Sequence, residues 1–174
     1  MERPDILKKH EILNRLSALP QKLLKLHGNE NVSEFVLHEL CNQHCFNISK
    51  AAYIVDNPDF DCMKGVAGFS ATEAFNTEPI WDDPESFTEH MKKSQFNNKV
   101  RDFIKPSMRR ASKSDEHTSH MIAEFVGITK PGYCTWDMKH DNHGILVYET
   151  QIASPASQEI LRNGACFLGF CPIN

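Results

Sequence analysis

The chain has 174 residues, of which 40% are hydrophobic and 24% are charged, with a net charge of −4 and a pI near 6.1. A globular chain of this length buries roughly 70% of its unfolded surface on folding, so its core requires no disulfide or metal. The slightly acidic balance excludes a general electrostatic attraction to nucleic acid or to an anionic membrane. We therefore expect neither partner.

The start of the chain and its hydropathy bear on the expected cellular location, which in turn bears on the redox state of the cysteines. The start, Met1–Asp5, is polar, and no run approaches the ~20 apolar residues of a membrane helix. We therefore expect no signal peptide and a location in the cytoplasm. Without an export signal, six dispersed cysteines are expected to be reduced thiols.

The first third of the chain predicts helices followed by a strand. Apolar residues at three- and four-residue steps predict an amphipathic helix over Pro4–Leu19, ended by Pro20. A short helical turn follows over residues 21–27, and Val32–Cys45 is apolar around most of a helix. Lys50–Asp56 is apolar on both faces of a pleat, which predicts an interior strand.

The middle of the chain is expected to alternate between loops and helices. A loop after the interior strand contains Gly65 and Gly68, whose spacing suggests a tight turn, and a short strand over Val66–Ser70. Helical pieces are predicted over Trp81–Ser114, broken at Pro106.

The last third predicts one helix, a hairpin, a second helix and a strand. Ser114 is placed to cap a helix that runs to Val126. Two alternating runs, 132–138 and 144–150, predict a β-hairpin whose tight turn is Asp141–Asn142. Ser154–Pro155 then begins a helix that ends at Gly164, and the apolar run 165–170 predicts a closing strand.

This order predicts an α+β fold with an antiparallel sheet of about four to five strands and helices packed on it. One domain is expected over residues 1–174, in which an N-terminal helical segment (1–28) precedes an α+β core (31–174). The stretch Val32–Asp56, a helix leading into a buried strand, together with the element order, resembles sensor modules of the GAF and PAS kind. The resemblance implies a ligand-binding regulatory role.

A candidate metal site combines one helix with the hairpin tip. His117, His120 and Glu124 fall within about a 60° arc of the predicted helix, beside its apolar face. His140 and His143 flank the predicted turn, where they would face each other and supply further ligands. Two imidazoles and a carboxylate suit a divalent transition metal. The alternative is that the helix histidines are half-buried and hydrogen-bonded, and that the hairpin tip is exposed to solvent.

Cysteine-based sites form a second group of hypotheses. Glu34, His38, Cys41 and Cys45 also share about a 60° arc and would suit zinc, but the spacing lacks a close cysteine pair, which favours core packing. Cys62 and Cys134 are candidate nucleophiles, although each would need a histidine partner.

The marked charge asymmetry lies in residues 99–113, which hold six basic residues and one acidic residue. Within it, Arg101, Lys105, Arg109 and Arg110 are candidates to contact a phosphate or an acidic partner. The tetrad Arg109-Arg110-Ala111-Ser112 also resembles a site for a basic-directed kinase. A solvated helical face is the simpler interpretation.

Three functions stay open, because the sequence contains no phosphate loop, dinucleotide fingerprint, HExxH or GxSxG motif. The first is a regulatory module with a small-molecule or metal site and a pocket lined by Tyr53 and Trp136. The second is a metal-dependent enzyme using the histidine and glutamate site. The third is a non-catalytic protein that binds an acidic partner through residues 99–113.

Overall fold

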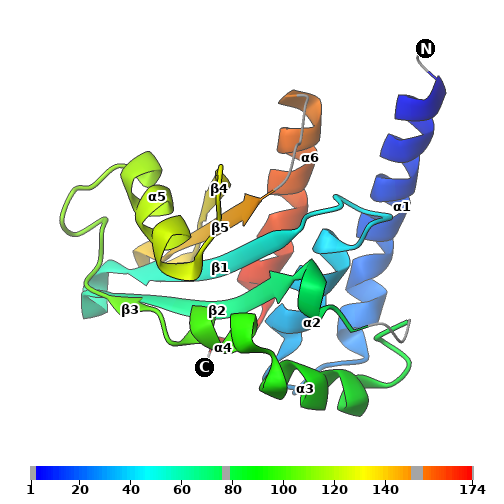
Figure 1. Ribbon diagram of the computed structural model, residues 1–174, viewed down its shortest axis with the longest axis horizontal. Helices are drawn as coiled ribbons and strands as arrows, with labels where there is room; N and C mark the ends of the chain where they lie inside the picture. The colour runs from blue at the N-terminus through cyan, green and yellow to red at the C-terminus, as the bar shows by residue number, and fades with distance from the viewer. Residues whose placement is uncertain (1–2, 76–78, 150–154, 174) are drawn as a thin grey trace.

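The computed structural model describes residues 3–75, 79–149 and 155–173, and these form an α+β fold with a five-stranded antiparallel sheet (Figure 1). The predicted fold class is therefore confirmed. The helices are α1 (Arg3–Leu24), α2 (Val32–Cys41), α3 (Pro84–Lys93), α4 (Gln95–Arg101), α5 (Asp115–Val126) and α6 (Pro155–Ala165). The strands are β1 (Lys50–Asn57), β2 (Cys62–Ser70), β3 (Ile104–Lys105), β4 (Gly132–Asp137) and β5 (His143–Glu149).

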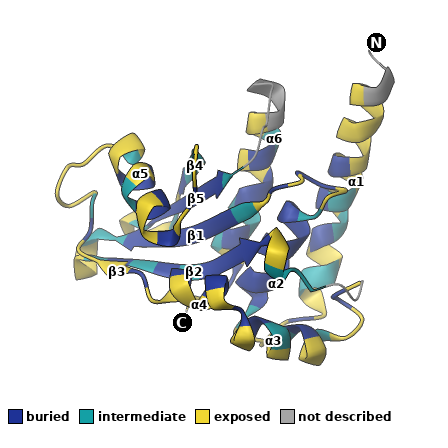
Figure 2. Ribbon diagram, in the orientation of Figure 1, coloured by how far each residue is buried: buried dark blue, intermediate teal, exposed yellow. Residues whose placement is uncertain are grey.

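The sheet has the order β3-β2-β1-β5-β4, so β1 lies in the middle, as the apolar residues on both faces of its pleat predicted. The side chains of β1 alternate between two hydrophobic clusters, one on each face of the sheet. Tyr53 and Val55 point into the larger cluster, with α1, α2, α3 and α6, whereas Ala52 and Ile54 point toward α4 and α5. Figure 2 shows β1 and β5 buried along most of their length between these helices.

The glycine pair in β2 has a packing role. Gly65 and Gly68 lie within the strand and not in a tight turn, so that prediction was wrong. A Cβ on Gly65 would overlap the backbone carbonyl of Val100, and one on Gly68 would lie 2.6 Å from the Val100 side chain. The two glycines therefore allow α4 to approach the sheet closely.

Two predicted boundaries near the N-terminus are corrected. Pro20 does not end the first helix, because α1 continues to Leu24 and is held to the body by Leu16 and Leu19, which are buried in the larger cluster. The second helix ends at Cys41, four residues before the predicted end. There the chain turns back, and the Phe46 N–H donates to the Leu40 carbonyl at 3.1 Å.

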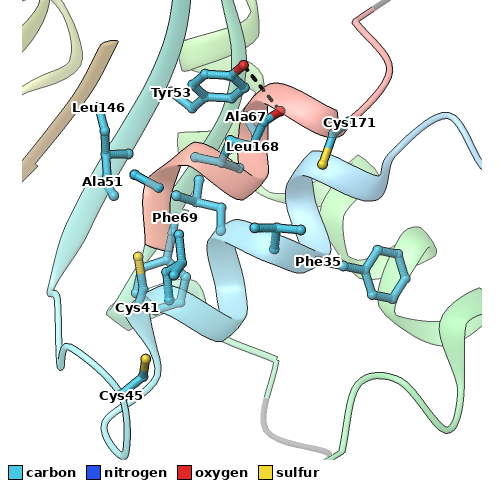
Figure 3. Close-up of a cluster of buried hydrophobic side chains, with 14 of the residues drawn as sticks. Phe35, Cys41, Cys45, Ala51, Tyr53, Ala67, Phe69, Leu146, Leu168 and Cys171 are labelled. Atoms are coloured by element: carbon cyan, nitrogen blue, oxygen red, sulfur yellow. Dashed lines mark hydrogen bonds between the residues drawn. The ribbon is translucent and has the colours of Figure 1, made fainter. Parts of the chain in front are cut away.

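The predicted closing strand is also corrected, since residues 166–170 form a 3₁₀ helix that continues α6. A short apolar run does not distinguish a strand from a buried helical turn. In this turn Leu168 is buried, and its carbonyl accepts the Tyr53 hydroxyl at 3.4 Å (Figure 3). Ser154, the predicted cap of α6, lies outside the described residues.

The helix α5 and the hairpin are confirmed, but the turn of the hairpin is different. The Ser114 hydroxyl accepts the His117 N–H at 3.1 Å, as a capping residue should. In the hairpin Asp137 pairs with His143, so residues 138–142 form the loop in place of a two-residue turn.

The predicted helical pieces between Trp81 and Ser114 are α3 and α4, followed by the short strand β3. No helix in the described ranges has both the length and the apolar character needed to cross a membrane.

Candidate functional site

The predicted metal-binding helix lies beside the hairpin, but its candidate ligands face solvent. His117, His120 and Glu124 are exposed on the outer face of α5, while Ile122 and Val126 pack into the smaller cluster. Sequence periodicity placed the three polar residues on one ridge of the helix. The ridge, however, is directed away from the protein interior.

His143 is buried at the start of β5 and is held between two carboxylates. Its Nδ1 lies 3.2 Å from Asp137 Oδ1, and its Nε2 lies 3.6 Å from Asp115 Oδ1 at the start of α5. His140 is exposed in the loop and does not pair across the hairpin. Within the described ranges, no group of three or more His, Cys, Asp and Glu side chains is placed to hold a metal ion. A metal site at these residues stays a prediction.

The aromatic pair proposed for a ligand pocket lies in the packed core. The Tyr53 and Trp136 rings stack 5.7 Å apart, and both residues are buried. Gly144 and Gly169 lie directly against the Trp136 indole. Neither aromatic residue lines the cavities described below, so this pocket stays a prediction.

The basic run 99–113 is divided among three elements and is not one helical face. Arg101 on α4 pairs with the buried Glu34 at 3.4 Å, and Arg109 pairs with Asp137 at 3.3 Å. Lys105 and Arg110 are exposed. The expectation of a solvated helical face was therefore wrong, while contact with an anionic partner stays a prediction.

A sheet-end anchor, formed by Asp56 and Asp61, holds the base of the segment between β3 and α5. The fully buried Asp56 accepts the backbone N–H groups of Met108 and Arg109, each at 3.1 Å through Oδ2. Asp61 accepts the Ser107 N–H at 3.1 Å. Because these bonds are made to main-chain N–H groups, the end of the β1–β2 pair fixes where this segment begins.

Of the cysteines in the proposed sites, Cys41 and Cys45 lie in the larger hydrophobic cluster and Cys134 packs against it, whereas Cys62 is partly exposed. All six lie within the described ranges, and none forms a disulfide. Burial raises the pKa of Cys41 and raises the pKa values of Cys45 and Cys134 to about 12, so these thiols stay protonated at neutral pH. A protonated thiol is a poor nucleophile and a poor metal ligand. This supports core packing for Cys41 and Cys45.

A cavity of about 460 Å³ lies between α1, α2 and residues 79–81, and we call it the α1–α2 cavity. This volume is in the range of small-molecule sites. Arg15 and Lys22, seven residues apart on α1, line one wall, and Glu39 of α2 lines the opposite wall. Ile80 and Trp81 supply apolar surface. The cavity thus combines apolar walls with charged groups from two helices.

Glu39 is the polar centre of the α1–α2 cavity. Its side chain is 6% exposed, and its Oε1 lies 3.2 Å from both Arg15 Nη1 and Lys22 Nζ. Oε2 accepts the Trp81 indole N–H at 3.2 Å. A buried carboxylate needs such partners to offset its loss of hydration. The two cations are partly exposed, at 27% and 30%, and so remain accessible from the cavity.

His38 lines both this cavity and a second cavity of about 360 Å³ that is bordered by Cys41 and Phe69. Its ring meets Phe69 and Phe87 edge-on, with centroids 4.9 and 5.0 Å away. Burial, with a smaller contribution from His90, lowers the pKa of His38 to about 4, so the ring is neutral at pH 7. Its Nδ1 is buried and has no hydrogen-bond partner within the described structure.

Sequence reasoning missed most of this cavity. His38 was noticed with Glu34, but Arg15, Lys22 and Glu39 resemble the ordinary charged residues of two amphipathic helices. The one available signal was that Glu39 lies in a helix predicted to be buried around most of its circumference.

Comparison with protein-family models, curated proteins and solved structures finds no match to the chain. The resemblance to GAF and PAS modules therefore stays a prediction.

Proposed function

We propose that the chain is a ligand-binding regulatory module that takes a small organic anion, a monocarboxylate with an apolar body, into the α1–α2 cavity. The observation that supports this most is the shared ion pair, in which two cations of α1 meet one buried carboxylate. Arg15, Lys22 and Glu39 together carry +1, and the fourth charged group of the lining, Glu11, is half-exposed at 51% and lies near His44. A ligand carboxylate would bind the two partly exposed cations beside Glu39.

The walls of the α1–α2 cavity favour a ligand that is apolar beyond its carboxylate. Ile80 and Trp81 lie on the lining with the two cations, and Lys22 Nζ is 5.6 Å from the centre of the Trp81 ring. An aromatic or branched acid would place its body against the indole and its carboxylate near Arg15. A guanidinium binds a carboxylate through two parallel hydrogen bonds.

The position of α1 supports a regulatory role. This helix supplies one wall of the cavity and is packed on the body through Ile12, Leu16 and Leu19. A ligand that contacts α1, α2 and residues 79–81 together would hold α1 more firmly against the body. The bound state would then present a more rigid N-terminal helix to a partner.

Thermal unfolding with benzoate tests the proposal. We expect benzoate to raise the melting temperature in a concentration-dependent way, and the neutral isostere benzamide to raise it less. Lys22→Gln should weaken benzoate binding about tenfold, whereas Lys25→Gln, an exposed change in the turn directly after α1, should not. Equal stabilisation by benzoate and benzamide, or an unchanged response in Lys22→Gln, would contradict an anion site.

A further inference from the structure

Residues 109–114 form the tip of the segment between β3 and α5, and they take no part in the α1–α2 cavity. Residues 109–114 are all exposed, and Ser112 adopts a left-handed backbone conformation with φ of 57°. Figure 1 shows this segment as an outlying loop on the side of the molecule away from α1. It is therefore open to a macromolecular partner.

The tip and the base of this segment are held differently. The base is fixed by the sheet-end anchor, in which Asp56 binds the N–H groups of Met108 and Arg109. The tip is closed by turns, in which the N–H groups of Ser112 and Lys113 donate to the Arg109 and Met108 carbonyls at 3.0 and 2.9 Å, and by the exposed Arg109–Asp137 ion pair. Exposed backbone hydrogen bonds of this kind open locally at low cost.

We propose that Ser112 is the phosphoacceptor of a serine kinase that recognises arginines two and three residues before the serine. Arg110 and Arg109 occupy these positions. Arg110 is exposed and has no ion pair among the described residues, and Arg109 has only an exposed pair with Asp137. Both guanidinium groups can therefore be bound by the carboxylates of a kinase substrate groove without disturbing the core.

The reaction requires ATP as the phosphoryl donor. The bond between the γ-phosphorus and the bridging oxygen breaks, ADP leaves, and a new bond forms between that phosphorus and Ser112 Oγ. The hydroxyl proton passes to the base of the kinase. Because the tip must extend to enter the kinase, the turns at Ser112 and Lys113 open first, while the anchored base stays in place.

The phosphate would change the charge pattern at the start of α5. It adds about −2 near Arg109, where it competes with Asp137 for the guanidinium. Ser112 also lies two residues before Ser114, the cap of α5, and an anion near a helix N-terminus is favoured. We therefore expect phosphorylation to exchange the Arg109–Asp137 pair for an Arg109–phosphate pair.

The test uses the full chain, ATP with magnesium, and the purified catalytic subunit of a kinase that selects Arg-Arg-x-Ser. We expect a mass gain of one phosphoryl group, assigned to Ser112 by fragmentation. The gain should be abolished in Ser112→Ala and unchanged in Ser86→Ala, an exposed serine preceded by Asp83, Pro84 and Glu85 and by no arginine at these positions. Arg110→Gln should slow the reaction at least about tenfold.

A synthetic peptide of residues 105–118 separates the motif from the fold. Labelling of the peptide but not of the folded chain would show that the fold hides Ser112, and would overturn the proposal. So would labelling that persists in Ser112→Ala, or no labelling of either form. This inference is independent of the α1–α2 cavity, because neither the segment nor Asp56 lines that cavity.

Discussion

The α1–α2 cavity and the sheet-end anchor each contain a buried carboxylate, and the two have different kinds of partners, with Asp56 Oδ1 left without a hydrogen bond in the described structure. Glu39 is neutralised by side chains, two flexible cations and an indole N–H. Asp56 binds two backbone N–H groups through a single oxygen. Backbone partners fix the course of the chain, whereas long cationic side chains can exchange one carboxylate for another. We therefore assign a structural role to Asp56 and a binding role to the surroundings of Glu39.

The largest effect is expected at the sheet-end anchor. Asp56→Ala should lower the free energy of unfolding by about 3 kcal/mol, because it removes two hydrogen bonds to a fully buried side chain and leaves two backbone N–H groups without a partner. Asp59→Ala, an exposed neighbour, should change it by less than about 0.5 kcal/mol. Urea denaturation measures both. Similar small values for the two variants would remove the structural role of Asp56.

A smaller loss is expected in the cavity. Glu39→Gln should cost about 2 kcal/mol in urea denaturation, because it leaves Arg15 and Lys22 without their shared carboxylate. The cost is below that of a fully buried pair, since both cations can regain water. A larger loss of unfolding free energy in Glu39→Gln than in Asp56→Ala would contradict the assignment of the structural role to Asp56 and of the binding role to the surroundings of Glu39.

The pH dependence of stability gives a third test, at His38. Its pKa is about 4 in the folded chain and 6.5 when unfolded, so the unfolded state takes up the proton first as pH falls. Stability from the neutral ring is thus complete above about pH 6.5 and is lost toward pH 4, at most about 1.4 kcal/mol per unit. His38→Phe, which keeps a ring, should flatten this slope. His10→Gln, an exposed control, should not, and an equal slope in all three proteins would contradict a buried neutral His38.

The smallest effect is expected at the exposed ion pair of the segment tip. Arg109→Gln should lower the free energy of unfolding by less than about 1 kcal/mol, because both partners of the Arg109–Asp137 pair are exposed. The matched change Arg110→Gln should have no measurable effect. A loss above about 2 kcal/mol for Arg109→Gln in chemical denaturation would show that the side chain, and not its backbone N–H, holds the segment.

The sequence predicted local structure better than it predicted either buried carboxylate. The apolar pleat of β1 and the Ser114 cap of α5 are local patterns, and both are confirmed. The run 165–170 failed because its length and apolarity fit a strand and a 3₁₀ turn equally well. Residue spacing alone does not indicate that Glu39 is buried, since its burial depends on how α1 and residues 79–81 pack across α2.

The same limit applies to the predicted histidine and glutamate site. Helical winding correctly gathers His117, His120 and Glu124 on one ridge, but the direction of that ridge is set by the packing of Ile122 and Val126. Among the histidines of that predicted site, the buried one is His143, which lies in a strand beside two aspartates. Its surroundings follow from strand register and from the start of α5, neither of which appears in a local pattern.

The most direct test of the α1–α2 cavity uses the two tryptophans of the chain, Trp81 on the cavity wall and Trp136 in the core. The indole N–H resonances of both would be followed by NMR during a benzoate titration. We predict a saturable shift of the Trp81 resonance with little movement of Trp136, and a loss of that shift in Lys22→Gln. A Trp81 resonance that stays unmoved, or that moves equally in Lys22→Gln, would contradict binding of an organic anion there.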